Sequence, residues 1–136
     1  MNNPTIIHKT ALAVIKDKKI LLTREADQKE KFFMLGGRVE EGEAEANALH
    51  REVLEEIGCK IASGSLTFLQ EFQALAHGME NTLVNIRLYA GTLVGEPVPS
   101  SEIEELRYFD STIDKRHLTP ISEDIFAWLK VNGHID

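Results

Sequence analysis

Three glutamates near the middle of the chain, Glu52, Glu55 and Glu56, have the spacing of a metal-binding cluster. On a helix of about 3.6 residues per turn, positions i, i+3 and i+4 share one flank, so these side chains are expected to converge. Glu55 and Glu56 also fall in the last helical turn, where the negative end of the helix dipole disfavours each by roughly 0.3–1 kcal/mol. A positively charged partner beside the helix would offset this repulsion.

The residues before the predicted helix favour an ion of the magnesium type. The small residues Gly36 and Gly37 let a phosphate approach the backbone closely, and a carbonyl of this pair can face the same flank as the glutamates. A set of carboxylate and carbonyl oxygens suits hard Mg²⁺ or Mn²⁺. The competing interpretation is an ordinary solvated acidic face, with Arg51 and Lys60 softening the repulsion.

The spacing of these residues resembles the Nudix box. Gly37, Glu43 and the run Arg51–Cys59 reproduce its order of a glycine, a glutamate, Arg-Glu, an apolar residue, Glu-Glu, a glycine and a last apolar residue. Every charged position and both glycines agree. Leu35 stands where many members have proline, and Cys59 takes the last apolar position. Neither departure removes an expected metal ligand.

The resemblance implies an α/β protein, a Nudix α/β/α sandwich with a mixed β-sheet and helices on both sides, in one domain over residues 1–136. It implies an enzyme that hydrolyses the pyrophosphate linkage of a nucleoside diphosphate derivative with Mg²⁺, or with Mn²⁺ as a substitute. Arg51 would orient Glu52, and Glu43 would support the metal-binding end of the helix. The implied metal ligands are the carbonyl of Gly36 and the carboxylates of Glu52, Glu55 and Glu56.

The proton of the attacking water must pass to a carboxylate, and two candidates stay open. Glu52 is the candidate within the box. Glu102 is the candidate outside it, in the segment Gly95–Leu106, which resembles the distal loop that often supplies a second acid in this family. Glu104 and Glu105 lie behind it. A run of exposed loop acids is an equally good interpretation of each of these residues.

Several other residues could contact a ligand, but ordinary roles are the better interpretation. Arg24 and Arg38 could hold a phosphate, although each is expected to be a surface cation. His77 and His117 lack a second histidine at ligand spacing and are expected at the surface. Four aromatic residues either stack on a nucleobase or fill the core, a choice left open by the sequence: Phe32, Phe33, Tyr108 and Phe109.

Hydrophobic periodicity locates the elements that must position these residues. A helix is predicted from Glu43 to Ile57, with Ala46, Leu49, Val53 and Ile57 as its packed stripe and with Gly58 ending it. A second helix is predicted at Ile121–Val131, with Ser122 as its N-cap or as a first-turn residue. The predicted strands are Thr5–Ile15, Ile20–Arg24, Phe32–Leu35 stopped by the double glycine, Ser65–Leu75, Thr82–Leu93 and Leu106–Asp110.

The composition limits the classes of protein. A chain of 136 residues with 43% hydrophobic residues is long enough for one domain with a core. No apolar run approaches the roughly 20 residues that span a bilayer. A formal charge of −7 argues against broad binding to nucleic acid. Cys59 is the only cysteine, so an internal disulfide is excluded and a small buried residue is expected there.

The expected partner is therefore a small nucleoside diphosphate derivative, with no nucleic acid and no membrane. The sequence does not set the oligomeric state, and a homodimer is suggested only by the resemblance, since related proteins often pair. Residues Met1–Pro4 show no export signal, which favours the cytoplasm. The sequence does not distinguish nucleoside triphosphates, nucleotide sugars and ADP-ribose. The main alternative is a noncatalytic nucleotide-binding module of the same fold, which loss of a box acid would favour; none is lost.

Overall fold

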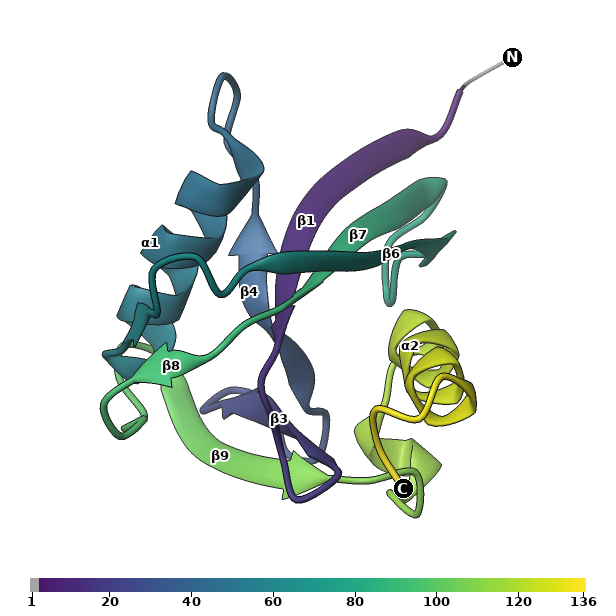
Figure 1. Ribbon diagram of the computed structural model, residues 1–136. Coiled ribbons are helices and arrows are strands. Elements are labelled where there is room, and N and C mark those ends of the chain that lie inside the picture. The colour runs from purple at the N-terminus through teal and green to yellow at the C-terminus, as the bar shows by residue number, and fades with distance from the viewer. Residues whose placement is uncertain (1–2) are drawn as a thin grey trace.

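A mixed β-sheet with one α-helix on each side forms the protein in a computed structural model, which describes residues 3–136 (Figure 1). Met1 and Asn2 of the predicted 1–136 domain lie outside the described residues. The strands are β1 (Thr5–Ala13), β2 (Ile15–Lys16), β3 (Lys19–Glu25), β4 (Phe33–Arg38), β5 (Lys60–Ile61), β6 (Thr67–Leu75), β7 (Thr82–Ala90), β8 (Leu93–Val94) and β9 (Ile103–Phe109). The helices are α1 (Glu45–Ile57), α2 (Pro120–Val131) and the 3₁₀ helix η1 (Lys115–His117).

The large sheet has the order β2-β3-β4-β1-β7-β6, and β9 pairs with the other edge of β3. Among the strands of residues 3–136, only β1 and β7 run parallel, while β5 and β8 form a small separate pair. β4 changes partner along its length: Phe33 and Met34 pair with β3, and Leu35–Arg38 pair with β1. Because β4 exchanges partners, the end of β3 and the start of β1 are not held together by a continuous ladder.

α1 covers one face of the sheet. Its buried residues Leu49, Val53 and Ile57 recur every four positions and share a core cluster with Leu12 and Leu35 of the sheet. The sheet supplies side chains at every second position, so one face of β1 can serve this cluster while the other serves α2.

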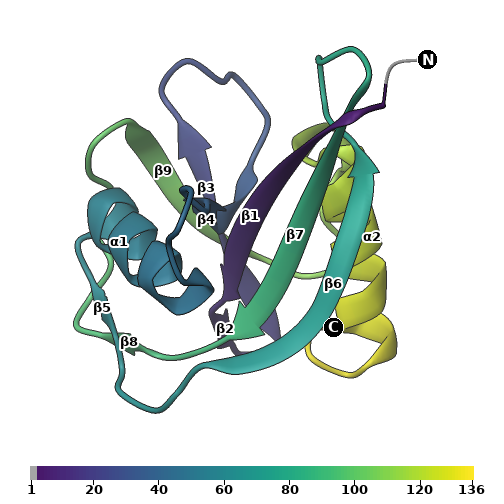
Figure 2. The ribbon, with the colours of Figure 1, turned by 90° about the horizontal axis from the view of Figure 1, so that it is seen from above.

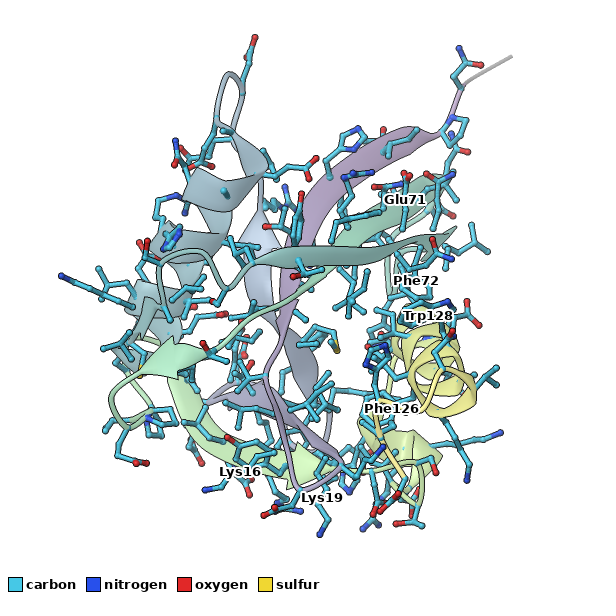
Figure 3. All side chains as sticks on the ribbon, viewed as in Figure 1. Lys16, Lys19, Glu71, Phe72, Phe126 and Trp128 are labelled. Atoms are coloured by element: carbon cyan, nitrogen blue, oxygen red, sulfur yellow. The ribbon has the colours of Figure 1, made fainter. Side chains whose placement is uncertain are left out.

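α2 covers the opposite face, so the helices lie on either side of the sheet (Figure 2). Ile125 and Leu129 are buried against Leu88 of β7 in the second core cluster. At the sheet edge, Phe72 of β6 meets Trp128 edge-on, with ring centroids 6.1 Å apart (Figure 3). This arrangement confirms the predicted α/β/α sandwich with a mixed sheet.

β4 differs from the sequence-based prediction because it runs through the double glycine instead of stopping before it. Gly36 pairs with Ala11, and Gly37 pairs with Thr10. Gly36 has φ +133°, and a Cβ there would overlap the carbonyl oxygen of Thr10 and lie 2.9 Å from the Cα of Ala11. Glycine is therefore what allows this strand to approach β1 so closely.

The start of α1 also differs from the prediction. The helix begins at Glu45, and Glu43 belongs to the preceding turn, where it binds Arg51. Ala46, predicted to lie in the packed stripe, is exposed because it lies in the first turn, beyond the core. Ala48 is fully buried instead, on the flank that carries Glu52 one turn later.

Other boundaries shift by a few residues. α2 begins at Pro120, and its N-cap is Thr119, whose hydroxyl accepts a hydrogen bond from the Ser122 amide; Ser122 is thus a first-turn residue. Cys59 is buried with 2% exposure, as expected. Among residues 3–136, no helix has the length and apolarity to cross a membrane.

Candidate active site

A cavity of about 660 Å³ lies between the sheet, α1 and the start of α2. Three of the residues predicted for the site line it: Gly36, Glu52 and Glu56. Its volume lies in the range of small-molecule sites, about 300–1,000 Å³. The charged side chains that line the cavity are Lys9, Glu25, Arg38, Glu40, Glu52 and Glu56.

The remaining lining of the cavity is largely apolar. β1 and β7 supply Ile7, Val84 and Ile86, and the start of α2 supplies Ile121. The acids come instead from α1, from the end of β3 and from the segment after β4. Such a mixed lining suits a ligand that combines a charged group with a larger, less polar one.

Glu56 is the most perturbed carboxylate of the cavity. Burial, together with like-charge repulsion from Glu52, Glu25 and Glu55, raises its pKa to about 8. The amide of Gly36 donates a hydrogen bond of 2.9 Å to its Oε1, which opposes these effects. Acids thus outweigh the positive charge of Lys9 around this carboxylate, as expected where a cation is to bind.

Arg51 links two acids of the box. Its guanidinium donates two hydrogen bonds of 2.9 Å to the two carboxylate oxygens of Glu43, and a third of 2.7 Å to Oε1 of Glu52. A fourth, of 3.1 Å, reaches the carbonyl of Arg38 at the end of β4. Arg51 lowers the pKa of Glu43 to about 2, and Glu43 in turn raises the pKa of Arg51. The fork thus holds Glu52 in one orientation relative to β4.

Arg51→Lys is expected to lower kcat/KM by about 10- to 100-fold, because an ammonium keeps the charge but cannot make this set of bonds. Steady-state kinetics with the best available substrate would measure the loss. Lys60→Arg, at an exposed residue of β5, makes a matched control at a site outside the cavity. An Arg51→Lys variant as active as the Lys60→Arg control would contradict the orienting role.

Gly37 brings β4 against Glu52. A Cβ at position 37 would lie 2.5 Å from the carboxyl carbon of Glu52 and 2.7 Å from its Oε2. The absent side chain therefore makes the space that the Glu52 carboxylate occupies. Arg51 holds the same carboxylate from its other oxygen.

Glu55 and Glu102 do not line the cavity. Glu55 is exposed, although it is near enough to raise the pKa of Glu56. Glu102 is exposed beside the end of β3, where its backbone carbonyl accepts a hydrogen bond from Ala26 and its charge helps to raise the pKa of Glu25. The structure thus brings Glu52 and Glu56 together in the cavity and leaves the other two acids outside its lining.

The segment before Glu102 is attached to the C-terminal end of α1. The amides of Val98 and Ser100 donate hydrogen bonds of 3.0 Å to the carbonyls of Ile57 and Glu56, respectively. The hydroxyl of Ser100 donates to the carbonyl of Glu55. These donors satisfy carbonyls that a helix end leaves without intrahelical partners.

Arg24 has a structural role. It donates hydrogen bonds of 3.1 and 3.2 Å to Glu105 and Glu104, and another to the carbonyl of Gln28. Glu104 and Glu105, which the sequence offered as further acids behind Glu102, are thus already paired with a cation. Arg38, by contrast, lines the cavity.

The donor set of the cavity fits a hard divalent cation in its chemistry. Its acids offer only oxygen atoms, and the amide of Gly36 on β4 lies beside one of them, Glu56. Among residues 3–136, no three or more His, Cys, Asp or Glu side chains are arranged closely enough to form a ready metal site. The predicted ligand set of Gly36, Glu52, Glu55 and Glu56 therefore stays a proposal.

Three charged residues of the cavity were missed by the sequence analysis: Lys9, Glu25 and the exposed Glu40. Lys9 lies on β1 between the apolar residues Ile7 and Ala11, all three on the cavity side. A lysine at a core-facing strand position was a usable signal, because alternation predicts an apolar residue there. Glu25 ends β3 at a register shift opposite β9, and such irregularities re-aim side chains.

The aromatic and histidine residues divide between core and cavity. Phe32 is buried in the core, and Phe109 meets it edge-on at 5.0 Å. Phe33, one position later on β4, lines the cavity. His77 is exposed, as predicted, and also lines the rim of the cavity.

The family model for the NUDIX domain matches residues 7–129 of the chain. The chain belongs to the Nudix family. The match extends over the cavity, the whole Nudix box, all of α1 and α2 as far as Leu129, so the family predicted from the box is confirmed. No curated protein matches the chain.

Solved structures of Nudix proteins share the fold. A MutT protein from Methanosarcina mazei Go1 aligns with a TM-score of 0.77 at 18% identity, over 97% of this chain and 98% of that one. A MutT Nudix hydrolase from Burkholderia pseudomallei aligns at 0.73 with 22% identity, over 89% and 95%. A structure described as a UDP-X diphosphatase aligns at 0.75 with 19% identity, over 98% and 66%. The family match, with neighbours described as hydrolases, supports the prediction of a Nudix pyrophosphohydrolase.

Proposed function

We propose that the protein is a metal-dependent diphosphatase that cleaves the pyrophosphate linkage of a nucleoside diphosphate derivative by attack of water at phosphorus. The observation that carries the proposal is the pair Glu52 and Glu56, which meet in a cavity of ligand size with the pKa of Glu56 raised to about 8. The neighbour described as a UDP-X diphosphatase supports this class of reaction.

The residues proposed to hold Mg²⁺, or Mn²⁺ in its place, are the carbonyl of Gly36 and the carboxylates of Glu52, Glu55 and Glu56. When bound, the cation supplies positive charge against the diphosphate and a water of lowered pKa. Arg51 keeps Glu52 oriented through its three-way hydrogen bonding. Glu43 holds Arg51 in place and so acts on Glu52 only through Arg51.

The base that takes the proton from the attacking water is proposed to be Glu52 or Glu102. Glu52 is favoured by its position in the cavity, and Glu102 by its place beside Glu25 at the end of β3. Comparing the variants Glu52→Gln and Glu102→Gln would separate them. Glu102→Gln is the decisive variant: if Glu102 is the base, this variant loses kcat while keeping its affinity for Mn²⁺. If Glu52 is the base, Glu102→Gln keeps kcat, and Glu52→Gln loses both kcat and Mn²⁺ affinity because Glu52 is also a proposed ligand.

A substrate panel tests the proposed activity. Purified protein with Mg²⁺ or Mn²⁺ is expected to release a phosphate-containing product from at least one of a set of nucleoside triphosphates, nucleotide sugars, ADP-ribose and dinucleoside polyphosphates. Chelation of the metal with EDTA is expected to stop the release, and excess Mg²⁺ to restore it. No product from any compound, with correctly folded protein, would contradict the proposal.

A noncatalytic nucleotide-binding module of the same fold is the second candidate function. Equilibrium binding of a nucleotide in the presence of metal, without turnover, would favour it. The cytoplasmic location of the protein and its pairing into a homodimer also stay predictions. Sedimentation velocity of the full chain would test the pairing.

A further inference from the structure

Lys9 occupies an unusual place for a lysine. It lies on β1 in the interior of the sheet, with Arg38 of β4 and Ile86 of β7 as its neighbours in register. Its side chain is partly buried and lines the cavity. Burial and the positive charge of Arg38 lower the pKa of Lys9, while Glu25, Glu56 and Glu52 act in the opposite direction. The position is therefore costly for a cation that serves only packing.

Among residues 3–136, neither Lys9 nor Arg38 has a partner for its charge. In the part of the chain that the structure describes, no ion pair or side-chain hydrogen bond involves the ammonium of Lys9 or the guanidinium of Arg38. The other arginine beside the cavity, Arg24, is fully engaged by Glu104 and Glu105. A partly buried cation is normally paired, so Lys9 lacks the anion that its position calls for.

The acids of the cavity do not supply that anion. Glu25, Glu56 and Glu52 act on Lys9 by charge at a distance, and within residues 3–136 none of them forms an ion pair with it. A divalent cation that neutralises Glu52 and Glu56 also repels the ammonium. The negative charge that can then contact both the metal and Lys9 is that of the ligand.

We propose that Lys9 binds the diphosphate of the substrate, on the side opposite the carboxylates of α1, and so selects ligands with at least two adjacent phosphate charges. This assignment rests on the proposed function. The ammonium donates hydrogen bonds to non-bridging phosphate oxygens, and the diphosphate lies between the α1 acids with their metal and β1. Apolar neighbours such as Ile7 and Ile86 leave the rest of the cavity for the organic group.

Binding of methylenediphosphonate, which cannot be hydrolysed and carries no nucleobase, tests the proposal by calorimetry with Mg²⁺ present. Lys9→Met is expected to weaken binding at least about tenfold, and Lys9→Arg to stay within about threefold of the unchanged protein. Lys16→Met is the matched control, since Lys16 lies exposed on β2 at the hairpin end of the molecule (Figure 3). Mn²⁺ alone is expected to bind Lys9→Met as tightly as the unchanged protein, or more tightly, because a repelling charge is gone.

The outcomes separate this proposal from the proposed hydrolysis. Equal diphosphonate affinity in Lys9→Met and the unchanged protein would overturn the assignment, as would no binding to either. Parallel loss of Mn²⁺ and diphosphonate affinity would also overturn it, because Lys9 would then be supporting the fold of the site. Lys9-dependent binding by a protein that hydrolyses nothing in the substrate panel would uphold the assignment and contradict the hydrolysis.

Discussion

Glu56→Gln is expected to lower kcat by on the order of 10²–10³-fold while leaving the fold intact. Glutamine has almost the same shape, and its amide oxygen can still accept the hydrogen bond that Gly36 donates to Oε1 of Glu56. What it removes is the negative charge that the proposed metal requires. Steady-state kinetics and circular dichroism would measure the two quantities. Glu41→Gln, at an exposed position before α1, is the matched control.

Glu56→Gln is also expected to stabilise the metal-free protein at alkaline pH. The pKa of Glu56 is about 8 in the fold, well above its ordinary value of 4.5. The folded state therefore binds this proton more tightly than the unfolded state, and the resulting stability is complete below about pH 4.5 and is lost as the pH rises through about 8. Each tenfold difference in proton affinity corresponds to about 1.4 kcal/mol.

The melting temperature of metal-free Glu56→Gln should thus exceed that of the unchanged protein increasingly between pH 5 and pH 9, a comparison made by scanning calorimetry. Metal binding must displace the same proton, so Mn²⁺ affinity is expected to rise by up to about tenfold per pH unit below pH 8. Unchanged turnover in the variant, or an Mn²⁺ affinity independent of pH over this range, would remove Glu56 from the proposed ligands.

Replacing each of the two adjacent glycines with alanine is expected to impair a different property of the protein. Gly37→Ala places a Cβ 2.5 Å from the carboxyl carbon of Glu52, an end that Arg51 holds in place. The displaced carboxylate should lower kcat/KM by about 100-fold, because errors of about 1 Å in a site have effects of that size. Stability should fall only slightly, since a side chain can move where a strand cannot.

Gly36→Ala is expected to act on the fold itself. Its Cβ would overlap the carbonyl oxygen of Thr10 on β1, and its φ of +133° is a conformation that alanine rarely adopts. The expected loss is at least about 3 kcal/mol in the free energy of unfolding, measured with urea. Similar stabilities for the two variants, or full activity in Gly37→Ala, would contradict this division between fold and site.

The fold was largely predictable because its signals are local. The repeat of Leu49, Val53 and Ile57 located α1, and Gly58 marked its end in the left-handed conformation. The sequence-based prediction ended β4 before the double glycine because glycines usually interrupt strands. They do not interrupt β4 because β1 approaches it closely there. Gly36 pairs with Ala11, which lies 25 residues earlier in the chain.

The site was predictable where one helix carries it and not where separate strands meet. Glu52 and Glu56 follow from spacing on α1, and the family follows from the box. The exposed position of Glu55 depends on how α1 is rotated against the sheet, which spacing alone does not set. Lys9 and Glu25 enter the cavity because β4 exchanges its partner between β3 and β1, a property of pairing between distant segments.

The attachment of Val98 and Ser100 to the last carbonyls of α1 makes the box helix and the acid-bearing loop one cooperative unit. The last turn of α1 cannot open without breaking these three bonds, so the loop adds to the free energy of its local unfolding. Detachment of the loop would expose the last carbonyls of α1 and is expected to speed hydrogen exchange of the Val98 and Ser100 amides. The loop that carries Glu102 is thereby held to the end of the helix that carries Glu52 and Glu56.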